Sequence, residues 1–503
     1  MLGVLIFFIL LGCLVSWLIT YAILNTGVWH GNNRESQYHH THSGVIPRIG
    51  GVGMATAFGL VYLLCFAFLD HLDNSSLIHY AIVVGGIGAF FLGFIDDYYP
   101  LSAKLKFFIQ VLLALLAYAS GLSIERVGIP FTSIFIELNI FGLLITVVWF
   151  VAIMNLMNLI DGLDGLAGGI GLMLMLLLVY LSIQKDMLIP AILSLGMTGA
   201  CIGFLFHNFP PAKVYMGDSG AYLLGYVIAA LSLMNAEKGT VLAALIAPMF
   251  ALALPIADVG FAMLRRALQG LPIFRPDKGH IHHRLLRTGL SHRNAVLVLY
   301  SFSLLALLGG IMVFSWQGRY LPLFLGFAFA LLLLILRGQK ISYESMRTAI
   351  GQSLEVRQGV RNTISLQQWF ITEVDRADSG NGVWSDYHFL LKKMGFCKAE
   401  LEINGEKRSF YIPNISTEDP ELLWTKELVL DADNNVRLSL SGERDNFSEA
   451  QFDLLCDIAA ESWSRVSARW KELNGSELAF DAMAIEPSNY KAQRARNLYR
   501  PTY

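Results

Sequence analysis

The sequence predicts an all-α polytopic membrane domain followed by a small soluble α+β domain. Of the 503 residues, 55% are hydrophobic, and the mean hydropathy is +0.53. The charges are unevenly distributed, because residues 1–340 hold only 14 of the 39 acidic and 18 of the 37 basic residues. Apolar runs of about 18 to 22 residues, long enough to cross a hydrocarbon core, are confined to this first part. We therefore expect residues 1–340 to lie in a membrane and the remainder to lie in water.

About eleven apolar runs can be counted, and each predicts one transmembrane helix. They lie near residues 3–24, 51–69, 77–95, 104–121, 139–158, 163–183, 188–206, 219–234, 240–264, 295–316 and 320–336. No basic segment precedes the first run, and no clear small-residue cleavage site follows it. We therefore expect a membrane helix there instead of a signal peptide.

Lysine and arginine predict the orientation of these helices. The loops on one side of the predicted membrane carry twelve Lys and Arg residues, whereas the loops on the other side carry four. Positively charged loops stay on the cytoplasmic side. The N-terminus is therefore expected outside the cell membrane, and the basic loops and the C-terminal tail in the cytoplasm.

Four polar side chains follow one another at the inner end of the fifth predicted span, namely Asn155, Asn158, Asp161 and Asp164. In a helix the spacing of three residues places the first three roughly on one face. The glycines after the two aspartates supply a corner where the backbone can approach a ligand closely. Ionisable residues at membrane depth usually mark a substrate or ion pathway, although a helix cap followed by a glycine turn is the structural alternative.

Three further carboxylates are predicted on the same side of the membrane. Asp96 and Asp97 are adjacent, so a divalent cation, a nearby lysine or a shared proton should relieve their repulsion. Asp218 stands at the start of a span, where it would suit either an N-cap or a Mg²⁺ ligand. Lys104 is the candidate phosphate contact here, and both Lys104 and Lys106 would equally suit interfacial anchors.

Two segments carry cationic side chains that would suit a phosphate. Arg48 follows a proline and precedes glycines whose backbone N–H groups are free to bind an anion, although a snorkelling arginine would look the same. The segment from His280 through His282 and His283 to Arg284 is dense enough in charge to clamp a diphosphate. A zinc site or attraction to anionic lipid are the alternatives for this segment.

These motifs occur in the order typical of one family. Over about residues 1–335 the chain resembles the polyprenyl-phosphate N-acetylhexosamine-1-phosphate transferases, or glycosyltransferase family 4. The resemblance rests on Asp96-Asp97, Asn155-x-x-Asn158-x-x-Asp161-Gly-x-Asp164-Gly, Met216-Gly-Asp218-Ser-Gly and His280-Ile-His282-His283-Arg284. The last motif is similar to the GlcNAc-1-phosphate branch and unlike the phospho-MurNAc-pentapeptide transferases.

The resemblance implies transfer of a sugar 1-phosphate from a UDP-N-acetylhexosamine, with UDP-GlcNAc favoured, to undecaprenyl phosphate. UMP would be released in this first membrane step of envelope polysaccharide synthesis, such as that of O-antigen, at the bacterial inner membrane. A phospho-MurNAc-pentapeptide transferase and, with less support, a transporter are the alternatives. Mg²⁺ or Mn²⁺ is the expected cofactor, and nucleic acid is not an expected partner.

The resemblance also assigns roles. Asp218 would be the metal ligand, and the expected catalytic residues are Asp96, Asp97, His282 and His283. The expected substrate-binding residues are Arg48, Lys104, Asn155, Asn158, Asp161, Asp164, Asn208, Tyr215, His280 and Arg284.

Beyond the membrane domain (1–340) the sequence predicts three further parts. Residues 341–380 form a helical linker, residues 381–475 a soluble α+β domain, loosely GAF-like or PAS-like, and residues 476–503 a flexible tail. Alternating apolar residues predict the strands, and an amphipathic pattern from about residue 448 to residue 473 predicts a helix. Such a domain would suit ligand sensing, partner binding or the association of protomers into a homodimer.

Overall fold

The structure, a computed structural model, forms two compact units. One comprises Met1–Ala262 and Pro276–Lys340, and the other comprises Met263–Arg275 and Ile341–Tyr503. The residues that the structure describes are 2–26, 46–69, 76–128, 135–237, 249, 252–268, 285, 289–315, 343–376, 380–403, 405–411, 422–431 and 436–474.

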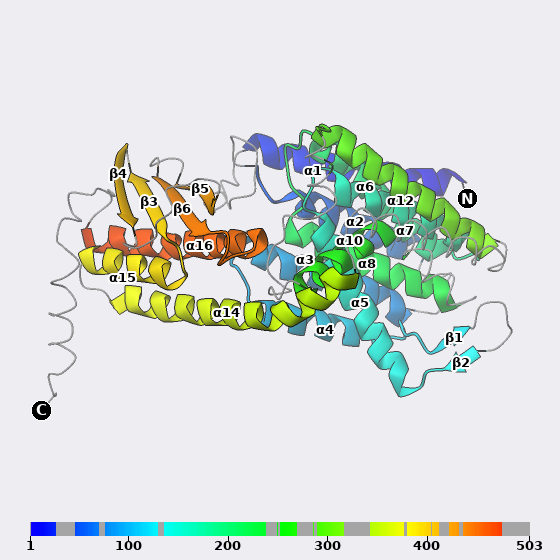
Figure 1. The fold of residues 1–503 in the computed structure, drawn as a ribbon. Coiled ribbons are helices and arrows are strands. Elements are labelled where there is room, and N and C mark those ends of the chain that lie inside the picture. Colours follow the sequence, from blue (N-terminus) through cyan, green and yellow to red (C-terminus); the bar gives the residue numbers. More distant parts are fainter. Residues whose placement is uncertain are drawn as a thin grey trace, which may run out of the picture. The chain divides into compact units, whose positions relative to one another are not determined.

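The first unit is built from helices and one short hairpin (Figure 1). Its described helices are α1 (Leu2–Thr26), α2 (Gly50–Leu69), α3 (Ser76–Tyr98), α4 (Ala103–Ala119), α5 (Ile140–Ile160), α6 (Leu166–Gln184), α7 (Leu188–Asn208), α8 (Gly217–Glu237) and α12 (His292–Ser315), together with the first ten residues of α10 (Ala253–Leu268). Between α4 and α5, strands β1 (Arg126–Gly128) and β2 (Phe135–Glu137) pair antiparallel.

Eight helices among the described residues are long and apolar enough to cross a membrane, namely α1, α2, α3, α5, α6, α7, α8 and α12. Helices α4, with 17 residues, and α10, with 16, are shorter. The expected span at 320–336 lies outside the described residues. The multi-pass helical class is thus confirmed, whereas the expected count of eleven spans is not.

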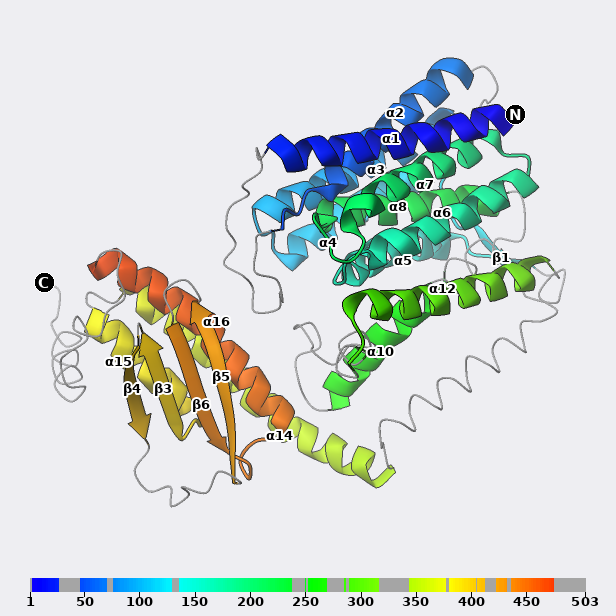
Figure 2. The ribbon, with the colours of Figure 1, turned by 90° about the horizontal axis from the view of Figure 1, so that it is seen from above.

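Helix α8 lies at the centre of this unit. It packs against α2, α3, α5, α6 and α7, and 94% of the residues in its apolar segment are buried. By contrast, only 22% of the corresponding segment of α1 is buried, and this helix packs on α7 and α2 at the periphery (Figure 2). The N-terminus of α8, which carries Asp218, is therefore held by several neighbouring helices at once.

The C-terminal unit contains a four-stranded antiparallel sheet with the order β4-β3-β6-β5. Its elements are α14 (Tyr343–Arg376), α15 (Gly380–Lys393), β3 (Lys398–Ile403), β4 (Glu406–Tyr411), β5 (Leu423–Asp431), β6 (Val436–Glu443) and α16 (Glu449–Asn474). The three helices pack on one another, and α16 also packs on β5 and β6.

Alternation along the strands creates the core of this unit. Buried Leu401 of β3 and Leu428 of β5 flank Leu438 of β6 on one face of the sheet, as expected for a sheet covered on one side. The α+β class is thus confirmed, while the likeness to GAF or PAS domains stays a prediction. Phe370 and Val374 of α14 are buried in the same core, so part of the expected linker belongs to the folded unit.

Candidate active site

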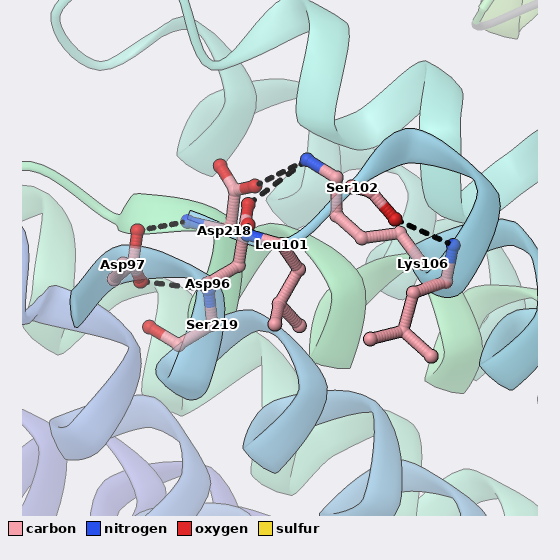
Figure 3. A network of polar contacts seen from close by, with 8 residues as sticks. Asp96, Asp97, Leu101, Ser102, Lys106, Asp218 and Ser219 are labelled. Atoms are coloured by element: carbon pink, nitrogen blue, oxygen red, sulfur yellow. Dashed lines mark hydrogen bonds and ion pairs between the residues drawn. The ribbon is translucent and has the colours of Figure 1, made fainter. Parts of the chain in front are cut away.

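Carboxylates bind the first backbone N–H groups of α8. These groups have no partner within a helix and lie at the positive end of its dipole. The Asp97 carboxylate, at the end of α3, accepts hydrogen bonds from the N–H groups of Asp218 (3.0 Å) and Ser219 (3.1 Å) (Figure 3). Asp161, which follows α5, accepts one from the Gly217 N–H. Asp97 therefore caps α8, and the Asp218 side chain is not needed as a cap.

Only glycine fits at the first position of α8. Gly217 has a φ of 74°, which L side chains rarely adopt. A Cβ atom there would lie 2.6 Å from Oδ2 of Asp97 and 2.9 Å from the carbonyl oxygen of Arg48. The glycine therefore lets the α3 carboxylate reach the helix end.

Asp96 faces the opposite way from its neighbour and meets Lys106 and Asp218 (Figure 3). Its carboxylate accepts hydrogen bonds from the Leu101 N–H (2.7 Å) and from Nζ of Lys106 (2.9 Å). The same Nζ lies 3.7 Å from Oδ2 of Asp218. The two carboxylates are within hydrogen-bonding reach of each other, and the Asn158 side chain bonds to Asp218. The Asp218 side chain is 29% exposed and that of Asp96 only 9%, so Asp218 is the more accessible ligand.

We call the four aspartates around the start of α8 the carboxylate cluster: Asp96, Asp97, Asp161 and Asp218. Burial raises the pKa of Asp161 well above its ordinary value, and the negative charges of Asp218 and Asp97 add to this effect. The Gly217 N–H and the charge of Arg48 act in the opposite direction. The cluster therefore resists carrying a negative charge on all four aspartates at once.

Asn155 does not join the cluster. Its amide nitrogen donates to the Gln110 side chain of α4 (2.7 Å) and to the Val151 carbonyl (2.7 Å). The Gln110 contact ties α4 to α5 one turn away from Asn158.

Asn208 and Asp164 hold the backbone around the cluster. Oδ1 of Asn208 accepts from the Gly165 N–H (2.9 Å), and its amide nitrogen donates to the Val214 carbonyl (2.7 Å). Oδ2 of Asp164 accepts from the Ala212 N–H (3.0 Å). Both side chains thus fasten the turn before α6 to the loop before α8, and their expected contact with substrate stays a prediction.

The segment that carries Arg48 lies beside the loop before α8. The Tyr215 N–H donates to the Pro47 carbonyl (2.9 Å), and the Tyr215 carbonyl accepts from the Gly50 N–H (2.9 Å). Burial and the nearby charge of Asp164 raise the pKa of Tyr215, so its hydroxyl stays protonated at neutral pH. Backbone pairing therefore brings Arg48 and Tyr215 to the cluster, as their expected roles require.

Among the described residues, the lysine at the cluster is Lys106, whereas the sequence argument favoured Lys104, which is exposed. A signal for this choice exists in the sequence. Ser102, Lys106 and Gln110 are spaced by four residues and therefore share one face of an otherwise apolar helix. That face is the one turned toward Asp96 and the end of α5.

The expected residues of the basic loop lie outside the described residues: His280, His282, His283 and Arg284. Their roles at the diphosphate or sugar stay predictions.

The carboxylate cluster fits a hard divalent cation in one particular way. Among the described residues, no three Asp, Glu, His or Cys side chains are arranged as a complete metal cage. Mg²⁺, however, keeps several waters and is usually held by one or two carboxylates together with substrate phosphates. Asp218, partly exposed and close to the Asp96 carboxylate, offers such a partial set.

The chain is similar to known proteins of one family. The model for glycosyl transferase family 4 matches residues 79–236. A probable undecaprenyl-phosphate N-acetylglucosaminyl 1-phosphate transferase of Bacillus subtilis (strain 168) is 35% identical over 283 residues, which are 56% of this chain and 77% of the relative. An undecaprenyl-phosphate alpha-N-acetylglucosaminyl 1-phosphate transferase of Haemophilus influenzae is 31% identical over 334 residues, or 64% and 90% of the two chains.

A decaprenyl-phosphate N-acetylglucosaminephosphotransferase of Mycobacterium tuberculosis (strain ATCC 25618 / H37Rv) is 35% identical over 292 residues, covering 53% of this chain and 71% of the relative. These relatives share most of their own length with this chain. The chain therefore belongs to glycosyl transferase family 4, in the branch of polyprenyl-phosphate N-acetylglucosamine-1-phosphate transferases, and carries the C-terminal unit in addition.

Proposed function

We propose that this protein transfers N-acetylglucosamine 1-phosphate from UDP-GlcNAc to undecaprenyl phosphate and releases UMP. The observation that carries the proposal is the carboxylate cluster at the start of α8, with Lys106 between Asp96 and Asp218, in a multi-pass member of this family. The proposed setting is the bacterial inner membrane, with the cluster on the cytoplasmic side and the N-terminus outside. The product would begin an envelope polysaccharide such as O-antigen.

In the proposed reaction, an oxygen of the lipid phosphate attacks the β-phosphorus of UDP-GlcNAc. A new P–O bond forms, and the bond from this phosphorus to the bridging oxygen breaks, so that its electron pair leaves with UMP. A phosphate monoester has a second pKa near 6, so the attacking group is largely deprotonated at neutral pH. The protein must therefore chiefly position two anions and neutralise their charge.

The described residues divide these tasks. Lys106 would contact phosphate oxygen from its place beside the paired carboxylates. Asp161, Asn158 and Arg48 would hold the nucleotide and its diphosphate, while Asp97 holds the first turn of α8 in position. His280, His282, His283 and Arg284 would complete the site around the sugar and the diphosphate.

Mg²⁺ or Mn²⁺ is the proposed cofactor, with Asp218 as its main ligand and Asp96 beside it. The cation would neutralise phosphate charge when the nucleotide is bound. Asp96, already bound to the Leu101 N–H and to Lys106, would keep Asp218 oriented toward the cation.

The test uses the full chain in nanodiscs that contain undecaprenyl phosphate. We expect UMP release and lipid-linked GlcNAc from UDP-GlcNAc with Mg²⁺, no turnover in EDTA, and restored turnover when Mg²⁺ is added back. Asp218→Ala should abolish transfer while the thermal unfolding transition remains. Substantial turnover by this variant would refute the metal assignment. If the wild type turned over another UDP-sugar and not UDP-GlcNAc, that sugar nucleotide would be the donor instead.

A further inference from the structure

Tyr300 of α12 contacts the corner between α5 and α6, residues 161–165, which we call the glycine corner. Its hydroxyl donates to the carbonyl oxygen of Gly165. The two residues are 135 positions apart in the sequence. The contact therefore fastens α12 to the segment that carries Asp161.

The Gly165 peptide groups are held from both sides. Asn208 accepts from the N–H of Gly165, and Tyr300 donates to its carbonyl. Gly165 has a φ of 77°, so the chain turns here through a conformation that few residues adopt. A turn with this backbone needs outside contacts if it is to keep one geometry.

The structure leaves room for the tyrosine ring. A Cβ atom on Gly169, one turn into α6, would lie 2.0 Å from the Tyr300 hydroxyl oxygen and 2.1 Å from Cζ. The ring thus occupies the space that the absent side chain leaves free. The Gly165 carbonyl also accepts the Gly169 N–H (2.9 Å), so it keeps a partner if the hydroxyl is removed.

We propose that Tyr300 is a positioning residue, which fixes the glycine corner and thereby the Asp161 carboxylate in the geometry that binds the nucleotide donor. This inference rests on the proposed function. It adds a contact between α12 and the glycine corner, and α12 follows in the sequence after the segment of His280, His282, His283 and Arg284.

A loosened corner must be ordered each time the donor binds, and this ordering lowers affinity without changing the chemical step. Tyr300→Phe should therefore raise the KM for UDP-GlcNAc and the Kd for UDP on the order of five- to tenfold, about the equivalent of one neutral hydrogen bond. The KM for undecaprenyl phosphate and kcat should stay within about twofold.

The matched control is Tyr226→Phe. Tyr226 of α8, which is buried where Tyr300 is half-buried, also donates its hydroxyl hydrogen to a backbone carbonyl, that of Ala81 (3.0 Å), but it bonds to α3 and not to the corner. We expect a similar small loss of thermal stability in both variants and unchanged donor KM and UDP affinity in the control. Gly169→Ala, which displaces the tyrosine ring, should reproduce the effect of Tyr300→Phe.

UDP affinity is measured by calorimetry on the full chain in nanodiscs, beside the transfer assay. Tyr300→Phe with a UDP Kd within twofold of wild type, or Tyr226→Phe with an equal loss, would overturn the inference. Absence of transfer from UDP-GlcNAc by the wild type would refute the proposed function, and the UDP comparison would still decide the role of Tyr300. Failure of the wild type to bind UDP would overturn both.

Discussion

The two adjacent aspartates should respond differently to the same substitution. The two carboxylate oxygens of Asp97 accept hydrogen bonds from the N–H groups of Asp218 and Ser219, whereas Asp96 faces Lys106 and Asp218. Replacement of Asp97 by Asn keeps one acceptor and places an NH₂ group against the other backbone N–H. The variant should therefore lose both stability and the position of the first turn of α8.

The expected magnitude follows from those two bonds. A hydrogen bond to a charged partner contributes about 1.5–3 kcal/mol, so Asp97→Asn should lower the free energy of unfolding by about 2–3 kcal/mol and Asp97→Ala by about 3–6 kcal/mol. A displacement of Asp218 by about 1 Å would cost about 10²-fold in kcat. Asp96→Asn leaves α8 capped but weakens the hydrogen bonds from Leu101 and Lys106, so it should lower kcat and should lower stability less than Asp97→Asn does.

Thermal unfolding in nanodiscs, followed by tryptophan fluorescence, and UMP release together provide the assay. Gly217→Ala should resemble Asp97→Asn, because its Cβ atom would lie 2.6 Å from Oδ2 of Asp97. If Asp97→Asn unfolds at the wild-type temperature and yet loses activity by more than about 10³-fold, Asp97 acts in the chemistry and the capping argument is wrong.

Three further predictions concern single charges. Lys106→Met should lower kcat by about 10²–10³-fold, because a cation at the reacting phosphates is lost, whereas exposed Lys104→Met should change kcat by less than about threefold; equal losses in UMP release would refute the distinction. Because the pKa of Asp161 is raised, its ionisation costs stability, so the unfolding temperature measured in EDTA should fall as pH rises above the ordinary aspartate pKa of about 4. Asp161→Asn should flatten this slope and unfold at a higher temperature at alkaline pH, and a slope equal to that of wild type would contradict the argument. In the C-terminal unit, Lys426→Met removes an ion pair with Asp453 (2.6 Å), whose side chain is 49% exposed, so stability should fall by about 1 kcal/mol or less with transfer unchanged.

The apolar runs and the alternating strands predicted most of the fold, because burial in lipid or in a core imposes a period on the sequence. The sequence also predicted Asp96, Asp97, Asp161, Asp164 and Asp218 at one membrane face, and all of them except Asp164 meet at the start of α8. The sequence could not show which of these carboxylates has which partner and role. Adjacent residues of a helix point about 100° apart, so the partner of each carboxylate depends on how α3 packs on α8.

Other contacts were hidden for a different reason. A tyrosine is common in apolar helices without any specific role, and no sequence feature near Tyr300 indicates a contact with Gly165. Lys106 could have been preferred over Lys104 from its spacing to Gln110, but a span edge attracts lysines for general reasons. In each case the missing information was tertiary, namely which face of one helix meets which turn of another.

The N-terminus of α8 has a consequence for how the substrates are held. A helix N-terminus ordinarily binds phosphate, because its free N–H groups point outward. Here the N–H groups of Gly217, Asp218 and Ser219 already bind the carboxylates of Asp161 and Asp97. In the proposed reaction, phosphate must therefore find its positive charge elsewhere: in Lys106 and Arg48 among the described residues, in the expected basic segment 280–284 and in the proposed cation. Transfer should for this reason depend steeply on the divalent cation, because the helix end cannot take over the cation's role.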